Sequence, residues 1–333
     1  MSSAAYSGQL ITVFGGSGFL GRHLVRALAA EGWRIRVACR RPDLAFHLQP
    51  LGRVGQIHAI QANVRNPASV AAALRGADAV VNLTGVLTPS GRQSFDAVHA
   101  FGARTIARAA KDAGVAKLLH VSAIGADADS ASAYQRSKAA GEAAVHEYAP
   151  HAQIIRPSII FGPEDDFFNR FAAIARMSPV LPLIGGGQTR FQPVFVGDIA
   201  TAMTRLAAGE GAAGAVYEFG GPQIKTFEEL LRYICEVTGR TRAFVPVPWG
   251  LAMAKGFALE LTHKLSLGIW PEWLTVTRDQ IRSLQSDNIV SDAAIAEGRV
   301  LQGLGVAPTA LEAVVPSYLY RFRKAGQFSK RAA

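Results

Sequence analysis

Three side chains near the middle of the chain have the types and spacing needed to move a proton. Tyr134 and Lys138 stand four residues apart in a helical pattern, which places both on one helix face. An ammonium beside a phenol stabilises the phenolate, so we expect the pKa of Tyr134 to lie below its ordinary value of about 10. Ser122 ends an apolar strand pattern twelve residues before Tyr134, where its hydroxyl is placed to hydrogen-bond the same substrate oxygen. Together they predict proton exchange with a carbonyl or alcohol during hydride transfer.

A glycine turn near the N-terminus supplies the second chemical feature. Gly15, Gly18 and Gly21 follow the apolar run Leu10–Phe14 and open a helical pattern with leucines on one face. Gly15 allows a sharp turn off the strand, Gly18 lets backbone approach a pyrophosphate, and Gly21 lets the helix pack closely on a sheet. The helix N-terminus offers free N–H groups to phosphates. The context of strand, turn and helix predicts a dinucleotide site.

Two arginines follow the second expected strand and bear on the choice of cofactor. Arg40 and Arg41 begin nineteen residues after Gly21, where an acidic residue would bind the ribose 2′-hydroxyl of NAD. Guanidinium groups suit a 2′-phosphate by charge and by geometry. We therefore expect NADPH rather than NAD, the alternative being two solvated arginines before Pro42.

Apolar strand-like runs alternate with helical patterns through the first half of the chain. Such alternation predicts an α/β fold with a Rossmann-type, doubly wound parallel sheet covered on both faces. Ligands bind these sheets beyond the carboxyl ends of the strands, where the chemistry-bearing residues stand. The expected strands are Leu10–Phe14, Arg34–Cys39, Ile57–Gln61, Ala79–Leu83, Lys117–Val121 and Gln153–Arg156.

Beyond about Pro157 the alternation loosens. We expect residues 1–157 to form the dinucleotide-binding core and 158–333 a smaller C-terminal lobe, parts of which return to the core. Phe227–Ile234 reads as a helix, and Thr309–Glu312 reads as a capping box that opens a last helix. Trp249–Trp273 suits either a helix buried in the lobe or a surface that docks on a partner or a bilayer interface.

The composition of the 333-residue chain restricts the remaining functions. The net charge is +10, which suits an anionic membrane or an acidic partner, but no nucleic-acid motif accompanies it. Cys39 and Cys235 form no metal or redox motif, so buried, inert thiols in a reducing compartment are expected. No secretory leader and no membrane span is expected, and no metal site.

These motifs together resemble the short-chain dehydrogenase/reductase superfamily, in its extended branch, over the first two-thirds of the chain. The resemblance implies that Asn63 and Val64 face the adenine and that Ser122, Tyr134 and Lys138 are the catalytic residues. It also implies that Leu83, Thr84 and Gly85 line the adjacent ribose and phosphates, and that Pro157, Ser158 and Ile159 line the nicotinamide. The expected cofactor contacts are Gly15, Ser17, Gly18, Phe19, Leu20, Gly21, Arg40, Arg41, Asn63, Val64, Leu83, Thr84, Gly85, Ser122, Tyr134, Lys138, Pro157, Ser158 and Ile159.

Several segments of the second half look like one subgroup of this superfamily. Phe161–Asp165, Gln192–Val196, Thr277–Gln280 and Leu304–Val306 resemble the NADPH-binding accessory subunit of respiratory complex I, alpha subcomplex subunit 9, and its bacterial relatives. The resemblance implies a tightly held NADPH with a structural or regulatory role. It implies other subunits of a respiratory membrane complex as partners. It also implies a peripheral location with membrane contact, on the cytoplasmic side of a bacterial inner membrane or the matrix side in mitochondria.

Two other functions stay open. A working NAD(P)-dependent oxidoreductase or epimerase would use Ser122, Tyr134 and Lys138 on a substrate that the sequence does not name. Nucleotide-sugar epimerases usually carry a histidine that Arg190–Phe195 lacks, and we expect Asp198 to be a helix N-cap rather than a catalytic acid. The third function is a redox sensor whose partner reads the NADPH state.

Overall fold

The computed structural model describes residues 8–265, 277–324 and 326, with the backbone alone for 258–265. The chain divides into two compact units. The first runs up to Pro157 and also takes in Val196–Phe219 and Val290–Ala307. The second comprises Ser158–Phe195, Gly220–Ile289 and the chain from Pro308 onward.

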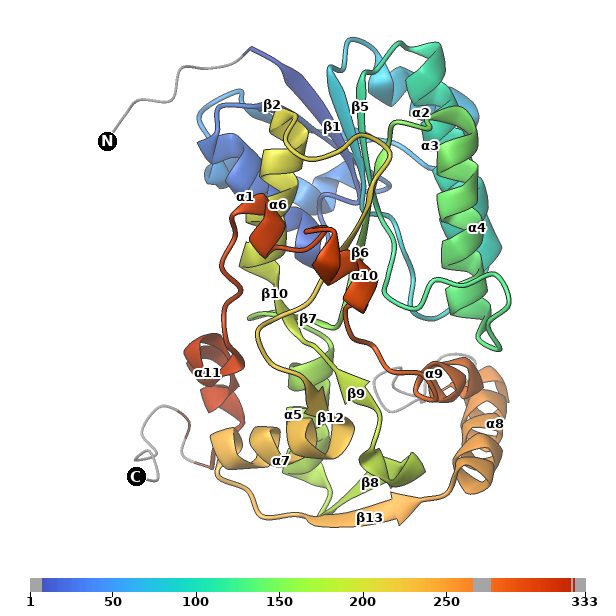
Figure 1. Ribbon diagram of the computed structural model, residues 1–333, viewed down its shortest axis with the longest axis vertical. Helices are drawn as coiled ribbons and strands as arrows, with labels where there is room; N and C mark the ends of the chain where they lie inside the picture. The colour runs from blue at the N-terminus through green and yellow to red at the C-terminus, as the bar shows by residue number, and fades with distance from the viewer. Residues whose placement is uncertain (1–7, 266–276, 325, 327–333) are drawn as a thin grey trace. The chain divides into compact units, whose positions relative to one another are not determined.

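A seven-stranded parallel sheet forms the centre of the first unit, which confirms the predicted fold class (Figure 1). The strand order is β11-β6-β5-β4-β1-β2-β3, so the chain starts in the middle of the sheet and crosses over after β3. Interior strand positions are apolar because helices cover both faces. The strands are β1 Leu10–Phe14, β2 Arg34–Cys39, β3 Ile57–Gln61, β4 Ala79–Asn82, β5 Lys117–Val121, β6 Gln153–Pro157 and β11 Val216–Phe219.

Helices cover the two faces of this sheet. On one face α1 packs against α6, and on the other α3 packs between α2 and α4 (Figure 1). Phe14, Val80 and Leu118 of the sheet and Ile106 of α3 belong to one buried apolar cluster. The helices of the unit are α1 Phe19–Ala30, α2 Pro67–Leu74, α3 Phe101–Asp112, α4 Ala133–Tyr148, α6 Val196–Ala208 and α10 Asp292–Ala296, with 3-10 turns at Pro42–Leu51 and Gln302–Leu304.

One helix of the first unit is irregular. A π-helical turn, Asp96–Ala100, precedes α3. Such turns are rare and often occur at functional sites. This one carries His99, whose side chain is buried.

The second unit contains short strand pairs and helices around an aromatic core. Strand β7 pairs with β10 and β8 with β13 in parallel, and β9 pairs with β12 antiparallel. Phe161, Phe168, Phe191 and Phe227 are buried in its core. Its elements are β7 Ile160–Phe161, α5 Phe167–Met177, β8 Val180–Ile184, a 3-10 turn at Gly185–Gly187, β9 Arg190–Phe191, β10 Val194–Phe195, β12 Lys225–Thr226, α7 Phe227–Thr238, β13 Ala243–Val247, α8 Trp249–Leu265, α9 Arg278–Ser283, α11 Leu311–Val314, α12 Pro316–Leu319 and a 3-10 turn at Tyr320–Phe322.

Helix α7 forms as predicted because its ends carry strong local signals. The Thr226 hydroxyl accepts the N–H of Glu229, whose carboxylate accepts the N–H of Thr226, and this reciprocal pair fixes the first turn. Gly239 ends the helix in the left-handed region, at φ +62°.

Two expectations about helix ends are wrong. The last helix begins at Leu311 with Ala310 at its N-cap and no side-chain cap, so Thr309 does not open a capping box. Pro316 begins a separate short helix, because proline has no N–H for a continuing ladder. Asp198 lies inside the first turn of α6 rather than at its N-cap, where its carboxylate still complements the helix dipole.

The segment Trp249–Trp273 is described only in part. Helix α8 covers Trp249–Leu265, and Phe257 is half-exposed with the Arg278 guanidinium 5.0 Å from its ring centroid. The apolar residues further along this segment lie outside the described side chains: Leu259, Leu261, Leu265, Ile269 and Trp270. In the part of the chain that the structure describes, no helix combines the length and apolar character that crossing a bilayer needs.

Candidate functional site

The glycine turn after β1 has the shape that its sequence predicted. Gly15 has φ +78°, which disfavours any side chain, and a Cβ there would lie 3.1 Å from the carbonyl carbon of Leu83. A Cβ on Gly21 would lie 2.5 Å from the carbonyl carbon of Gly16, so α1 packs against the turn with no space for a methyl group. Gly18 is the N-cap of α1 and supplies no side-chain cap, so the first helical N–H groups are left for a ligand.

A cavity of about 260 Å³ opens where β1, β2, β3 and β4 end. We call it the strand-end cavity. It brings together residues that are far apart in the sequence, and several of them were expected to contact a cofactor. The expected residues that line it are Gly15, Ser17, Gly18, Arg40, Asn63, Val64, Leu83, Thr84 and Gly85. The others are Ala38, Cys39, Ala62, Arg65, Val86, Gln93 and Val98. The other expected contacts do not line it: Phe19, Leu20, Gly21, Arg41, Ser122, Tyr134, Lys138, Pro157, Ser158 and Ile159.

The two arginines after β2 have different surroundings. Arg40 lines the strand-end cavity. The Arg41 guanidinium instead binds the Asp43 carboxylate at 2.9 Å on the exposed surface, and this pairing lowers the pKa of Asp43 and raises that of Arg41. Arg40 is thus the member of the pair that lines the cavity.

Polar side chains at the ends of β3 and β4 are fixed by local hydrogen bonds. The Asn63 side-chain oxygen accepts the N–H of Arg65 at 3.1 Å, and the Asn63 N–H donates to Ser69 Oγ at 2.8 Å. Asn82 Oδ1 accepts both the N–H and the hydroxyl of Thr84, at 3.0 and 2.6 Å. These contacts hold the backbone after each strand in a defined shape around the cavity.

The side chains of Tyr134 and Lys138 lie on one face of α4, as their spacing predicts. Lys138 Nζ lies 5.8 Å from the Tyr134 ring centroid and donates to the carbonyl of Val121 at 3.3 Å. A Cβ on Gly85 would lie 3.4 Å from Lys138 Nζ, so this ammonium stands directly behind one end of the strand-end cavity.

The expected lowering of the Tyr134 pKa is not found. Burial raises the pKa of Tyr134 to about 12, and burial lowers the pKa of Lys138 to about 8, against a smaller opposing effect of Glu142. The low dielectric around the ring penalises the charged phenolate. In the chain by itself Tyr134 is therefore a neutral phenol at pH 7.

Ser122 follows β5 and fits a ligand-binding role. Its N–H donates to the carbonyl of Ile155, but its buried hydroxyl finds no hydrogen-bond partner among the residues that the structure describes. A buried polar atom left unsatisfied is costly, and a ligand oxygen would satisfy it. This orphaned hydroxyl and the glycine-lined cavity together fit a bound nicotinamide dinucleotide.

His99 is a residue that the sequence reasoning missed. Its Nε2 accepts the N–H of Val86 at 3.0 Å, so the ring is neutral and its Nδ1 donates to Ser137 Oγ at 2.8 Å. Ser137 donates in turn to the carbonyl of Tyr134 at 2.7 Å. The rings of His99 and Tyr134 meet edge to face, with centroids 5.5 Å apart. The π-helical turn therefore connects the loop after β4 to the first turn of α4, and its long-range contacts left no signal in the sequence.

A second buried histidine lies on β5. His120 Nδ1 accepts from the Asn82 amide at 3.0 Å. Burial, with the Lys138 ammonium nearby, lowers the pKa of both His99 and His120 to about 3. Both rings are therefore neutral throughout the physiological range.

A charge network holds α4 to the sheet one turn beyond Lys138. Arg156 of β6 donates two hydrogen bonds to the Glu142 carboxylate, at 2.9 and 2.6 Å, and lies 3.8 Å from Glu218 of β11. Glu142 is nearly buried, and its hydrogen bonds raise the pKa of Arg156. Because the pair is bidentate, it fixes the rotation of α4 and hence the directions of Tyr134 and Lys138.

The residues after β6 have separate surroundings. Pro157 ends β6, whereas Ser158 and Ile159 belong to the second unit. The Ser158 hydroxyl donates to the backbone and side-chain oxygens of Asn288, at 2.9 and 2.7 Å. Its hydrogen-bonding capacity is thus used within that unit.

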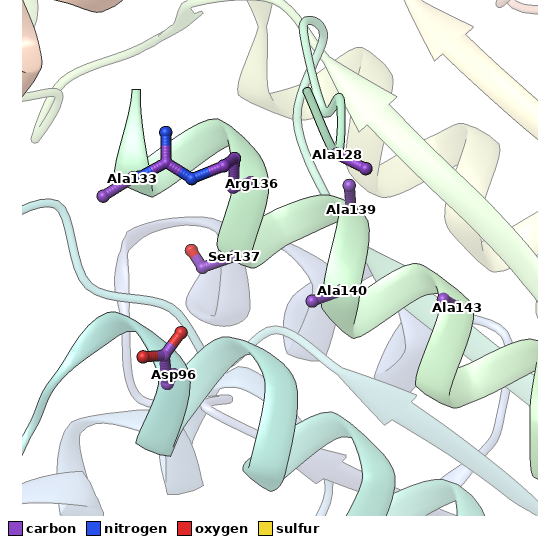
Figure 2. A pocket seen from close by; sticks show the side chains of 8 residues that line it. All are labelled: Asp96, Ala128, Ala133, Arg136, Ser137, Ala139, Ala140 and Ala143. Atoms are coloured by element: carbon purple, nitrogen blue, oxygen red, sulfur yellow. The ribbon is translucent and has the colours of Figure 1, made fainter. Parts of the chain in front are cut away.

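A second hollow, of about 460 Å³, lies on the outer side of α4 (Figure 2). Methyl groups of Ala133, Ala139, Ala140 and Ala143 line most of it, with the Asp96 carboxylate and the Arg136 guanidinium at its edge. None of the expected site residues lines it, so it is separate from the strand-end cavity.

Comparison with known proteins gives matches along nearly the whole chain. Residues 11–220 match the model of the NAD dependent epimerase/dehydratase family. The chain is 34% identical over 327 residues to NADH dehydrogenase [ubiquinone] 1 alpha subcomplex subunit 9, mitochondrial, of Arabidopsis thaliana, covering 97% of this chain and 80% of that protein.

Two further likenesses come from proteins whose names describe reductases. The chain is 37% identical over 175 residues to the ceramide reductase of Caulobacter vibrioides, covering 53% of this chain and 54% of that enzyme. The crystal structure of the NADPH-dependent quinone oxidoreductase QOR2 of Escherichia coli, complexed with NADPH, matches with a TM-score of 0.70 at 20% identity, over 93% of this chain and 99% of that one. At this identity the second likeness concerns the fold.

Proposed function

The chain belongs to the NAD dependent epimerase/dehydratase family and is homologous to alpha subcomplex subunit 9 of complex I, and we propose that it is an NADPH-carrying accessory subunit of a respiratory NADH:ubiquinone oxidoreductase. The observation that carries the proposal is a match to that subunit along 97% of the chain, combined with a strand-end cavity that retains the glycine turn. Its partners would be other subunits of the complex. Its location would be peripheral, on the cytoplasmic side of a bacterial inner membrane or the matrix side in mitochondria.

The choice of NADPH over NADH rests on Arg40. Arg40 lines the strand-end cavity beside Cys39 at the end of β2, the position at which NAD-binding chains carry a carboxylate. The first N–H groups of α1 would bind the pyrophosphate, and Ser122, Tyr134 and Lys138 would contact the nicotinamide end. When bound, the nicotinamide ring supplies or accepts a hydride.

A structural or regulatory role for the cofactor needs no proton transfer by Tyr134. Burial raises the pKa of Tyr134 to about 12, so at pH 7 the phenol does not take a proton from an alcohol, whereas it can give one to a carbonyl oxygen. A nucleotide that binds only the native state stabilises it by about 2.7 kcal/mol at a hundred times its Kd, with no turnover needed.

The proposal is tested by purifying the protein gently, from its native membranes and from a soluble expression host. Mass spectrometry of the released nucleotide should give NADPH in stoichiometric amount, in protein that co-purifies with a membrane complex. Thermal melts of nucleotide-free protein should rise with added NADPH. A melting temperature that NADPH does not change would refute the proposal.

A matched pair of variants tests the role of Arg40. Arg40→Gln should weaken NADPH binding roughly tenfold to a hundredfold and leave NADH binding unchanged, because it removes charge-assisted hydrogen bonds to the 2′-phosphate. Arg108→Gln removes the same charge from an exposed position on α3 and is the control. Equal weakening of NADPH and NADH by Arg40→Gln would contradict the assignment.

A second function is favoured by the unsatisfied hydroxyl of Ser122. An active oxidoreductase would use this hydroxyl and Tyr134 on a carbonyl or alcohol oxygen, and Lys138 to tune the phenol. A carbonyl substrate should then consume the bound NADPH, followed by its absorbance. Tyr134→Phe should stop the reaction, and Ser122→Ala should slow it without lowering the melting temperature, since the hydroxyl has no partner among the described residues. NADPH that stays reduced with every carbonyl tested would exclude this function for those substrates.

A further inference from the structure

Arg65 connects the two loops that flank the strand-end cavity. It follows β3, and its Nη1 donates to the backbone carbonyl of Arg92 at 3.2 Å, in the loop after β4. In the sheet order β4-β1-β2-β3, two strands separate β4 from β3. Neighbouring strands are about 4.8 Å apart, so the Arg65 side chain and the loop after β4 together bridge the ends of the two strands between them. Those ends, at Gly15 and Ala38, line the cavity.

The base of the Arg65 side chain is held firmly. Its N–H donates to Asn63 Oδ1 at 3.1 Å, and Ser69 Oγ exchanges hydrogen bonds with the N–H and the carbonyl of Asn63, at 2.8 and 3.2 Å. The other end of the span is a tight turn in which Ser90 and Gln93 exchange backbone hydrogen bonds at 3.2 and 2.9 Å. Local hydrogen bonds therefore hold the backbone at both ends of this link.

The strand-end cavity that Arg65 lines also has apolar walls. Val64, Val86 and Val98 line the same cavity as Arg65. Apolar walls suit the flat, largely apolar faces of an aromatic ring and disfavour a phosphate. One N–H of Arg65 is already used on a neutral carbonyl, and its planar guanidinium keeps a face with which to stack on such a ring. Arg40, at the end of β2, remains the cation for the 2′-phosphate.

We propose that Arg65 is a clasp that lies on the adenine ring of the bound dinucleotide and slows its release, with or without a 2′-phosphate. The proposal rests on the proposed nucleotide site and adds to it the residue that retains the cofactor. Three consequences follow. The clasp acts on the dissociation rate, it acts equally on NADPH and NADH, and it needs a planar side chain rather than a charge alone.

The experiment loads the full-length protein with NADPH or with NADH and measures release, after addition of excess oxidised nucleotide, from the decay of the nicotinamide fluorescence. Arg65→Gln should speed release of both nucleotides by a similar factor, roughly tenfold, because one stacking contact is lost. Arg65→Lys keeps the positive charge but lacks the planar guanidinium, so this variant should release nucleotide as fast as Arg65→Gln. Arg108→Gln is the control, and thermal melts of all variants show that they are folded.

The outcomes separate the clasp from the function on which it rests. Unchanged release from folded Arg65→Gln would overturn the clasp and leave the nucleotide site standing. If Arg65→Gln released NADPH faster but left NADH release unchanged, Arg65 would contact the 2′-phosphate rather than the adenine. If Arg65→Lys released both nucleotides as slowly as the wild type, a planar side chain would not be required. Wild-type protein that binds neither nucleotide would overturn the proposed function and the clasp together.

Discussion

Acidification should destabilise the sheet of the first unit, because two neutral histidines are buried against it. The pKa of His99 and of His120 is lowered from 6.5 to about 3 by burial, with the Lys138 ammonium adding to the effect. In the unfolded chain each ring takes up a proton as the pH falls through 6.5, whereas in the native state it stays neutral. The unfolded state therefore binds more protons below pH 6.5, and native stability falls with pH.

The size of the effect follows from the two shifts. One pH unit corresponds to about 1.4 kcal/mol for each proton bound by the unfolded state alone. Between pH 7.5 and pH 5.0 each histidine should thus lower the free energy of unfolding by about 2 kcal/mol, and the two together by about 4 kcal/mol. Asp165 of the second unit acts in the opposite sense, because burial raises its pKa to about 6 and the native state there takes up the proton first.

Amide hydrogen exchange measured on β5 reports on the first unit separately from Asp165. Opening free energies, corrected for the intrinsic exchange rates, should fall by about 4 kcal/mol between pH 7.5 and pH 5.0 in the wild type. His99→Asn and His120→Asn each remove one titrating ring and keep a polar group. The opening free energy of β5 in each variant should therefore fall by only about 2 kcal/mol over the same pH range. Equal protection of β5 at both pH values, or a fall that neither substitution reduces, would refute the reasoning.

Two further predictions concern packing at the site. Gly21→Ala should abolish the NADPH-dependent rise in melting temperature, because its Cβ would lie 2.5 Å from the Gly16 carbonyl carbon; an unchanged rise would contradict the close packing of α1. Glu142→Gln should lower the free energy of unfolding in urea by about 3 kcal/mol, because it leaves the half-buried Arg156 without its bidentate partner. Glu218→Gln, whose carboxylate is 3.8 Å from Arg156, should cost under about 1 kcal/mol, and similar losses for the two variants would show that the bidentate geometry is unimportant.

Periodicity and motifs predicted the elements that local sequence specifies. The first six strands of the sheet and the glycine turn were recognisable because buried parallel strands are continuous apolar runs and tight turns need glycine. Strand β11 was missed, since its four residues, VYEF, carry no run long enough to distinguish a strand. Its identity depends on pairing with β6, which lies about sixty residues earlier in the chain.

The site was predictable in its residue types but not in its electrostatics. Spacing predicted that Tyr134 and Lys138 share a helix face, but only the fold reveals that burial raises the pKa of the phenol. His99 and Arg65 gave no motif, because their partners, Val86 and Arg92, are 13 and 27 residues away. Contacts of this kind depend on which strand ends the topology brings together.

Strand β11 is synthesised after the other six strands of the sheet. The edge strand β11 is covered on its outer side by a still later segment, since Glu218 donates its N–H to the Arg299 carbonyl at 2.9 Å and accepts the N–H of Ser291 at 2.8 Å. A ribosome must therefore complete most of the chain before this edge is covered. Until then the nascent sheet exposes an open edge, first at β6 and then at β11, which invites pairing with another chain. Premature termination before Ser291 should accordingly yield aggregates rather than a smaller folded domain. A chaperone that binds exposed strand edges would bind the incomplete polypeptide.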